Sequence, residues 1–162
     1  MNKFNETEAI QIKIDYMAKI IPLISSGTAG PLGVIHLPRL WLKSSLEARG
    51  ILADGYPGCG KGYDQMVLDG LGLDRAATLG YIRDKRPSYA QFEAWVKSQP
   101  GVKLDKANIE KLNASIRGYN HDAATRSSVL GACGIPDNGT ILDAVNLNNL
   151  DDWQTFYEAN LK

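Results

Sequence analysis

Residues 88–119 read SYAQFEAWVKSQPGVKLDKANIEKLNASIRGY, and this stretch decides the fold class of the chain. Ser88 with Gln91 is a capping-box pattern that opens a helix, and Pro100-Gly101 ends it. Asp105 is suited to cap a second helix, in which apolar residues recur at steps of three and four. Those apolar residues are Ile109, Leu112, Ile116 and Tyr119. The stretch therefore predicts two amphipathic helices joined by a short turn.

Similar apolar spacing on both sides of this stretch predicts further helices. Residues 6–24 carry isoleucines and a methionine on one face, so a first helix is expected there. A second helix is expected to begin near Pro38 and to end at Gly50, because proline suits the first turn and glycine the end. The other expected helices cover residues 63–71, 74–83 and 121–130, with a last one around Trp153 and Phe156.

Strand-like alternation is scarce. Only residues 34–35 and 51–52 suggest pairing, as a minor β-ribbon. Two glycine-rich stretches, residues 25–33 and 55–62, predict loops on either side of the second helix. The sequence therefore predicts a mainly α fold. We expect a single compact multi-helix domain over residues 1–162, with glycine-rich loops and at most a minor β-ribbon.

The balance of charge argues against several classes of partner. Lys plus Arg and Asp plus Glu each number 18, so the chain lacks the basic excess of a nucleic-acid-binding protein. The longest apolar stretch is broken by prolines and glycines, and acidic residues interrupt the N-terminal segment where a signal peptide would be apolar. We therefore expect a cytoplasmic protein with no nucleic-acid or membrane partner.

Metal and cofactor motifs are incomplete. The two cysteines do not make a disulfide framework, and the two histidines alone do not build a three-ligand zinc site. Residues 55–62, GYPGCGKG, match the phosphate loop G-x-x-x-x-G-K, but Gly62 stands where Ser or Thr must bind Mg²⁺. We interpret this as a chance match, although backbone N–H groups of such a loop can still hold an anion. No metal and no cofactor are expected.

The segment HLPRLWLK, residues 36–43, is the first candidate site. Arg39 and Lys43 are four residues apart, so on a helix both project from one face, near its positive N-terminal end. They are candidates to bind the carboxylate or phosphate of a substrate, with Trp41 as a pocket wall. His36 is the candidate for proton transfer. The alternative is that Arg39 pairs with a structural carboxylate while Lys43 is solvated.

Further candidates follow this helix and recur near the last third of the chain. Tyr56 and Asp64 are candidates for proton transfer, and Asp64 is also the nearest carboxylate to offset the charge of Arg39. His121 is a candidate acid or base, with Asn120 beside it as a substrate-binding group. The alternative for this last pair is an ordinary capped junction between two helices.

Residues 33–43, GVIHLPRLWLK, resemble the G-x-x-x-LPR-M-x-x-K motif of a bacterial family catalogued as domain of unknown function family 5069. Roughly residues 28–157 follow the pattern of that family, and the glycine-rich residues 55–63 depart from it. The resemblance implies a small, mainly helical bacterial protein. It also favours Arg39 and Lys43 as an anion site, because they fall in the most specific part of the motif.

Two functions from different classes fit these patterns. The first is a cofactor-independent enzyme that uses acid/base chemistry on a small anionic organic substrate, as an isomerase, lyase or hydrolase. The second is a non-enzymatic module that binds a small molecule or another protein, with a homodimer as one form. A cavity beside Arg39 favours the enzyme, and a flat apolar patch on the first or last helix favours the module.

Overall fold

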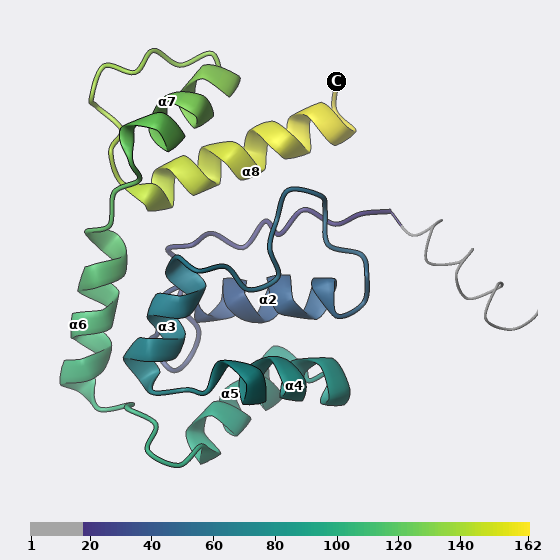
Figure 1. Cartoon of the computed structure of the whole chain (residues 1–162), viewed down its shortest axis with the longest axis vertical. Coiled ribbons are helices and arrows are strands. Elements are labelled where there is room, and N and C mark those ends of the chain that lie inside the picture. Colours follow the sequence, from purple (N-terminus) through teal and green to yellow (C-terminus); the bar gives the residue numbers. More distant parts are fainter. Residues whose placement is uncertain (1–17) are drawn as a thin grey trace, which may run out of the picture.

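A computed structural model describes residues 18–162 and shows an α-helical fold (Figure 1). Seven helices occur in this part of the chain. They are α2 (Leu37–Glu47), α3 (Tyr63–Leu71), α4 (Arg75–Lys85), α5 (Tyr89–Ser98), α6 (Lys106–Arg117), α7 (Ala123–Ala132) and α8 (Ala144–Asn160). The only extended pairings among these residues are isolated bridges. The predicted mainly α fold, a single multi-helix domain with glycine-rich loops, is confirmed.

The extended segments pair differently from the predicted ribbon. Leu52 forms a parallel bridge with Ile20, and Ile35 forms an antiparallel bridge with Ala29. The two segments predicted to form a ribbon therefore pair with other parts of the chain and not with each other. Ile35 meets its partner across a short loop, whereas the residues between Ile20 and Leu52 include the whole of α2.

Residues 18–24, at the end of the first predicted helix, are extended rather than helical. The Ile20 N–H donates to the Ile51 carbonyl at 2.7 Å, a backbone bond to the loop after α2. Pro22 has no N–H for a helical hydrogen bond, which removes support for a helix at this point. This part of the prediction is wrong, and residues 6–17 lie outside the described residues.

Short-range capping patterns fix the starts of most helices. Ser88 and Gln91 form the predicted capping box at α5, in which each side chain accepts the backbone N–H of the other residue. Asp105 caps α6 as predicted, and its carboxylate accepts the N–H of Asn108. The caps of α4, α7 and α8 are Asp74, Asp122 and Asp143. Each cap satisfies an N–H that the helix leaves free, so these starts are specified within three residues of sequence.

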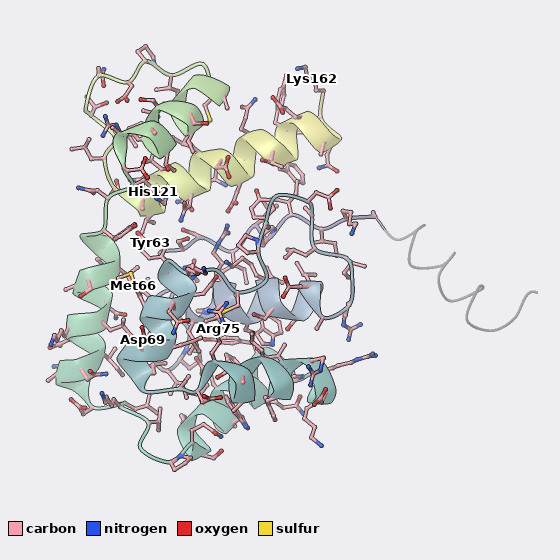
Figure 2. All side chains as sticks on the ribbon, in the orientation of Figure 1. Tyr63, Met66, Asp69, Arg75, His121 and Lys162 are labelled. Carbon is pink, nitrogen blue, oxygen red and sulfur yellow. The ribbon has the colours of Figure 1, made fainter. Side chains whose placement is uncertain are left out.

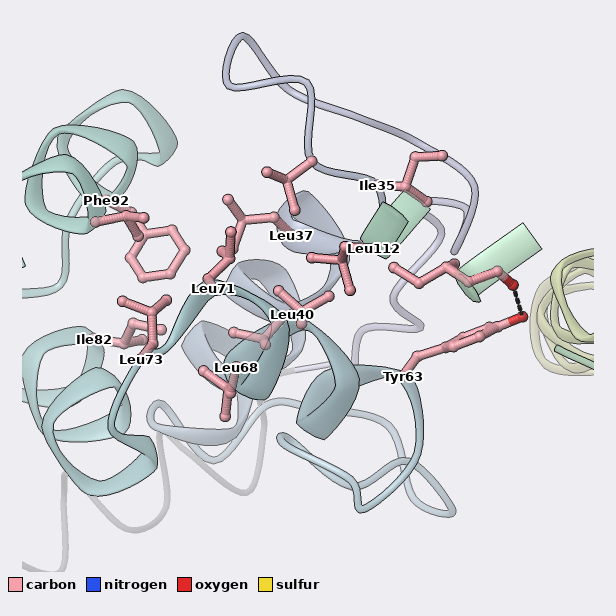
Figure 3. Close-up of a cluster of buried hydrophobic side chains, with 14 of the residues drawn as sticks. Ile35, Leu37, Leu40, Tyr63, Leu68, Leu71, Leu73, Ile82, Phe92 and Leu112 are labelled. Carbon is pink, nitrogen blue, oxygen red and sulfur yellow. Dashed lines mark hydrogen bonds between the residues drawn. The ribbon is translucent and has the colours of Figure 1, made fainter. Parts of the chain in front are cut away.

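The main hydrophobic core lies between α2, α3, α5 and α6 (Figure 3). Leu37 and Leu40 of α2 and Phe92 of α5 are completely buried in it. Tyr63, at the start of α3, lies at the edge of the core, where its hydroxyl donates to the Ile116 carbonyl at 2.9 Å (Figure 3). Burial of these side chains holds the start of α3 against α2, and this contact positions the candidate site.

The last two helices, α7 and α8, pack against each other and lie on the opposite side of α2 from α4 and α5 (Figure 1). The extended residues 18–24 run between α2 and α8, and Arg39 of α2 bonds both to Pro22 of this segment and to Asp152 of α8. Among residues 18–162, no helix combines the length and the apolarity needed to cross a membrane.

Candidate functional site

His36 immediately precedes α2 in a backbone conformation that favours glycine. Its φ and ψ angles are 71° and −17°, in the left-handed region. A residue with a β-carbon in this region carries a cost of roughly 1–2 kcal/mol, so neighbouring contacts must hold it there. The His36 N–H donates to the Thr28 carbonyl at 3.0 Å, and Pro38 occupies the first turn of the helix. Strain of this kind is common at functional sites.

Asp64, in the first turn of α3, is the carboxylate that His36 meets. One carboxylate oxygen accepts His36 Nε2 at 2.8 Å, and the other accepts Lys43 Nζ at 2.5 Å and the Gly60 N–H at 2.6 Å. Burial acts to raise the pKa of Asp64, but the hydrogen bond from His36 and the charge of Lys43 outweigh it and lower the pKa to about 2. Asp64 is therefore ionised at neutral pH.

The protonation of His36 follows from that of Asp64. Burial lowers the pKa of the imidazole from 6.5, and the opposing hydrogen bond and charge of Asp64 do not restore it. The ring is therefore neutral at pH 7. An ionised carboxylate only accepts hydrogen bonds, so the single ring proton sits on Nε2 and Nδ1 carries a lone pair. His36 Nδ1 is buried and has no hydrogen-bond partner among the described residues.

Arg39 has a different role from the predicted anion-binding group. Its guanidinium forms two bonds to Asp152 of α8, at 2.6 and 2.9 Å. It also donates to the Pro22 carbonyl at 2.5 Å and the Ile24 carbonyl at 2.8 Å. The alternative interpretation, a structural carboxylate partner, therefore describes Arg39 better, although the carboxylate is Asp152 and not Asp64. Lys43 is paired and buried rather than solvated.

A cavity of about 310 Å³ lies between the start of α2, the loop before α3 and the first half of α8. Five predicted site residues line it: His36, Arg39, Lys43, Tyr56 and Asp64. Four further side chains in its wall are Lys61, Asn148, Asp151 and Asp152. The cavity is therefore polar and rich in ionisable groups, which is the setting in which acid/base chemistry is found.

Comparisons with protein-family models, with curated proteins and with solved structures give no match to the chain. The resemblance to family 5069 thus stays a prediction. The function of the cavity must be argued from the chemistry of its own residues.

Tyr56 supplies a second polar group without a partner. Its hydroxyl is buried and has no partner at hydrogen-bonding distance and angle among the described residues, although Thr155 and Asp152 of α8 lie close enough to affect its pKa. Burial raises its pKa to about 12, so the hydroxyl stays protonated and can donate a hydrogen bond. Tyr63 lines the same cavity, but its hydroxyl is already bound to the Ile116 carbonyl. Tyr56 is therefore the tyrosine that is free to meet a ligand.

Lys61 and Asp151 are two charged groups of the cavity wall that were not predicted. Lys61 is exposed, and its ammonium has no acidic partner within residues 18–162. Burial and the nearby charge of Asp152 raise the pKa of Asp151. The pKa of His36 is thus lowered and that of Asp151 raised, so two titratable groups of the cavity wall are shifted from their usual values. Asp151 and Asp152 fall within residues 28–157, which resemble family 5069, but no local motif marks them as site residues.

Three predicted site residues lie outside the cavity wall. Trp41 faces the core edge and a different cavity, and its indole N–H donates to the Pro87 carbonyl at 3.0 Å. Asn120 is exposed and forms a backbone bridge with Asp143. His121 lies beside the start of α8, where its Nε2 is 2.9 Å from the Asn148 side-chain oxygen (Figure 2). His121 therefore contacts the cavity wall through Asn148.

The glycine-rich loop 55–62 binds carboxylates of the protein itself. The Gly60 N–H donates to Asp64, and the Gly58 N–H donates to Glu47 at 2.9 Å. Arg75 donates to the carbonyls of Cys59 and Gly60 in the same loop, so N–H and carbonyl groups of residues 58–60 form hydrogen bonds within the protein. No strand precedes the loop within the described residues, which agrees with its interpretation as a chance match to a phosphate loop.

Neither metal nor thiol chemistry is indicated by the described residues. Residues 18–162 contain no group of three His, Cys, Asp or Glu side chains that could hold a metal ion. Burial raises the pKa of the Cys59 thiol, which therefore remains protonated near neutral pH. The reactive groups available at the cavity are thus an imidazole, a phenol and carboxylates.

Proposed function

We propose that this chain is a cofactor-independent enzyme in which His36 acts as a general base on a small organic substrate. The observation that carries the proposal is the unpartnered Nδ1 of a neutral, buried imidazole whose other nitrogen is held by an ionised aspartate. Asp64 fixes the tautomer and the ring orientation, and it stabilises the imidazolium that forms when Nδ1 takes a proton. Lys43 keeps Asp64 ionised.

A second group of the cavity suits the same reaction. Tyr56 can donate a hydrogen bond to a substrate oxygen on which negative charge develops. Asp151 also lines the cavity, and the proton that His36 takes up can return to the product from the imidazolium. This set fits proton abstraction next to a carbonyl, elimination, or activation of a water, so the reaction classes are isomerase, lyase and hydrolase.

The proposed preference for an anionic substrate rests on the charge of Lys61, and no longer on the charges of Arg39 and Lys43. Both predicted cations are neutralised, by Asp152 and Asp64, so neither attracts a second anion strongly. Lys61 carries a charge without an acidic partner among the described residues and lines the same cavity. We place its ammonium against a carboxylate or phosphate of the substrate. The proposal also keeps the expected bacterial origin, the cytoplasmic location and the membership in family 5069.

Comparison of the two histidines tests the proposal. The chain has two histidines in all, and His121 does not line the cavity. Small hydroxy acids, keto acids and their esters are incubated with the protein in D₂O, and proton NMR follows deuterium uptake and product formation. Turnover is expected for the natural sequence and for His121→Asn, and His36→Asn is expected to lower it about 10²-fold or more. Asn is chosen because it tolerates the left-handed backbone.

Two results would contradict the proposal. Turnover that survives His36→Asn means that His36 is not the base. Equal loss of turnover in His36→Asn and His121→Asn means that the loss does not come from the free Nδ1 of His36. It comes instead from a changed contact at Asn148 or from lower stability of the variants. Far-ultraviolet circular dichroism and thermal unfolding of each variant separate the two causes.

One observation favours the alternative of a protein-interaction module. Trp153 and Tyr157 lie on α8, and Leu161 follows its last residue. The three are spaced four residues apart, and their exposed fractions are 59%, 48% and 67%. On a helix this spacing makes one apolar stripe, which is costly to leave in water. Under this alternative the stripe pairs with that of a second copy. Light scattering would then show a dimer that Trp153→Glu dissociates, and a monomer at every concentration would exclude it.

A further inference from the structure

A second cavity, of about 200 Å³, lies between α2 and α4, away from the site described above. The side chains of Trp41, Leu42 and Leu46 form its α2 side. Ile82 and Pro87 form the opposite side. The walls are thus mainly apolar, and Trp41 is fixed in place by its hydrogen bond to the Pro87 carbonyl. Apolar protein cavities of about 150 Å³ take up benzene, so this one has room for a single aromatic ring.

Two arginines at this cavity have no acidic partner. Arg49 follows α2 and Arg86 follows α4, and both belong to the cavity lining. The lining contains no Asp or Glu, and neither guanidinium forms an ion pair within residues 18–162. Two uncompensated cations beside an apolar cavity favour an anion that reaches both.

The backbone at Arg86 strengthens this point. Its φ and ψ angles are 47° and 52°, so it occupies the left-handed position after a helix, where glycine is the usual residue. An arginine here carries a conformational cost that glycine would avoid. The backbone conformation therefore does not explain why an arginine stands at this position. A binding role for its guanidinium explains it.

The cavity also holds a polar group with no partner. Ser45 Oγ lies in the lining, is closed off from bulk solvent and forms no hydrogen bond among the described residues. A serine inside a helix commonly bonds the carbonyl four residues before it, and Ser45 does not. Its hydroxyl is thus a buried polar group beside the cavity without a protein partner among the described residues.

We propose that this second cavity binds a small aromatic carboxylate. The ring lies against Trp41, Leu46 and Ile82, and the carboxylate lies between the guanidinium groups of Arg49 and Arg86. Ser45 bonds a polar atom of the ligand. This site is separate from the His36 cavity and does not depend on the function proposed for it.

Phenylacetate is the probe that tests the proposal. Increasing concentrations are added to the full ¹⁵N-labelled chain at constant ionic strength, and the indole N–H signal of Trp41 is followed by NMR, with Trp41→Phe used to assign that signal. We expect a saturable shift with phenylacetate, and a dissociation constant about tenfold higher for phenylacetamide, which keeps the ring but lacks the charge. Acetate, which lacks the ring, is expected to give no saturable shift.

Two variants test the assigned cation. Arg86→Gly removes the guanidinium and suits the left-handed backbone, so the variant is expected to fold and to bind phenylacetate about tenfold more weakly. Lys85→Gln is the matched control, because Lys85 is an exposed neighbour outside the lining, and it should leave binding unchanged. The proposal is overturned if phenylacetate gives no saturable shift, if the amide binds as tightly, or if Arg86→Gly binds as tightly as the natural sequence.

Discussion

Replacement of Arg39 by Ala should destabilise the fold strongly, because Arg39 connects three distant parts of the chain. Its side chain is 6% exposed and that of Asp152 is 3% exposed, so both charges are withdrawn from water. In Arg39→Ala, Asp152 is left as a buried carboxylate without its partner, and the Pro22 and Ile24 carbonyls lose a donor. Removal of one member of such a pair costs about 3–5 kcal/mol, a large part of the stability of a domain.

Urea unfolding at pH 7, followed by circular dichroism, measures this loss. The matched control is Arg83→Ala, which removes the arginine of an exposed pair with Asp84 and should leave the free energy of unfolding unchanged. The double variant Arg39→Ala/Asp152→Ala should lose less than the sum of the two single changes, because it leaves no buried charge unpaired. A loss below about 1 kcal/mol for Arg39→Ala would refute the buried pair as a structural connection.

Acidification and a loop substitution are expected to lower the stability of the fold, whereas removal of one hydroxyl is expected to lower turnover. Stability should fall as the pH drops below about 6.5, because the unfolded chain protonates His36 before the folded one does. Asp64 adds about 2 kcal/mol that is present above about pH 4 and lost as the pH falls through about 2. In urea titrations at several pH values, His36→Asn should abolish the first step and weaken the second, because the hydrogen bond from His36 helps to lower the pKa of Asp64. Gly30→Ala should lower the unfolding free energy by about 1–3 kcal/mol, because the new methyl group meets the Tyr89 hydroxyl and ring. Tyr56→Phe should keep or raise the melting temperature while it lowers turnover, because the hydroxyl it removes has no protein partner.

The parts of the fold that the sequence predicts well are those specified over a few residues. The Ser88–Gln91 capping box and the Asp105 cap involve residues three apart, and the structure contains both. The apolar stripe that includes Leu112 and Ile116 also follows from local spacing, and both residues are buried. Local rules therefore locate the helices along the chain.

The parts that sequence reasoning missed depend on contacts between distant residues. Asp152 lies 113 residues after Arg39, and nothing local selects it from the acidic residues of the chain. Residues 18–24 have helical spacing, but the bridge to Leu52 and the bonds from Arg39 hold them extended. His36, Arg39 and Asp64 line one cavity, but the carboxylate predicted for Arg39 binds His36 and Lys43 instead, and only the folded chain decides these pairings.

The protonation state of the His36 ring is the most direct test of the central claim, a free Nδ1 on a neutral imidazole held by Asp64. Long-range ¹H–¹⁵N NMR correlations of the ring nitrogens, recorded as a pH titration with His36→Asn for assignment, measure it. We expect a neutral ring at pH 7 with the proton on Nε2, and a pKa below 6.5. A ring that is protonated on both nitrogens at pH 7, or that carries its proton on Nδ1, would contradict the account.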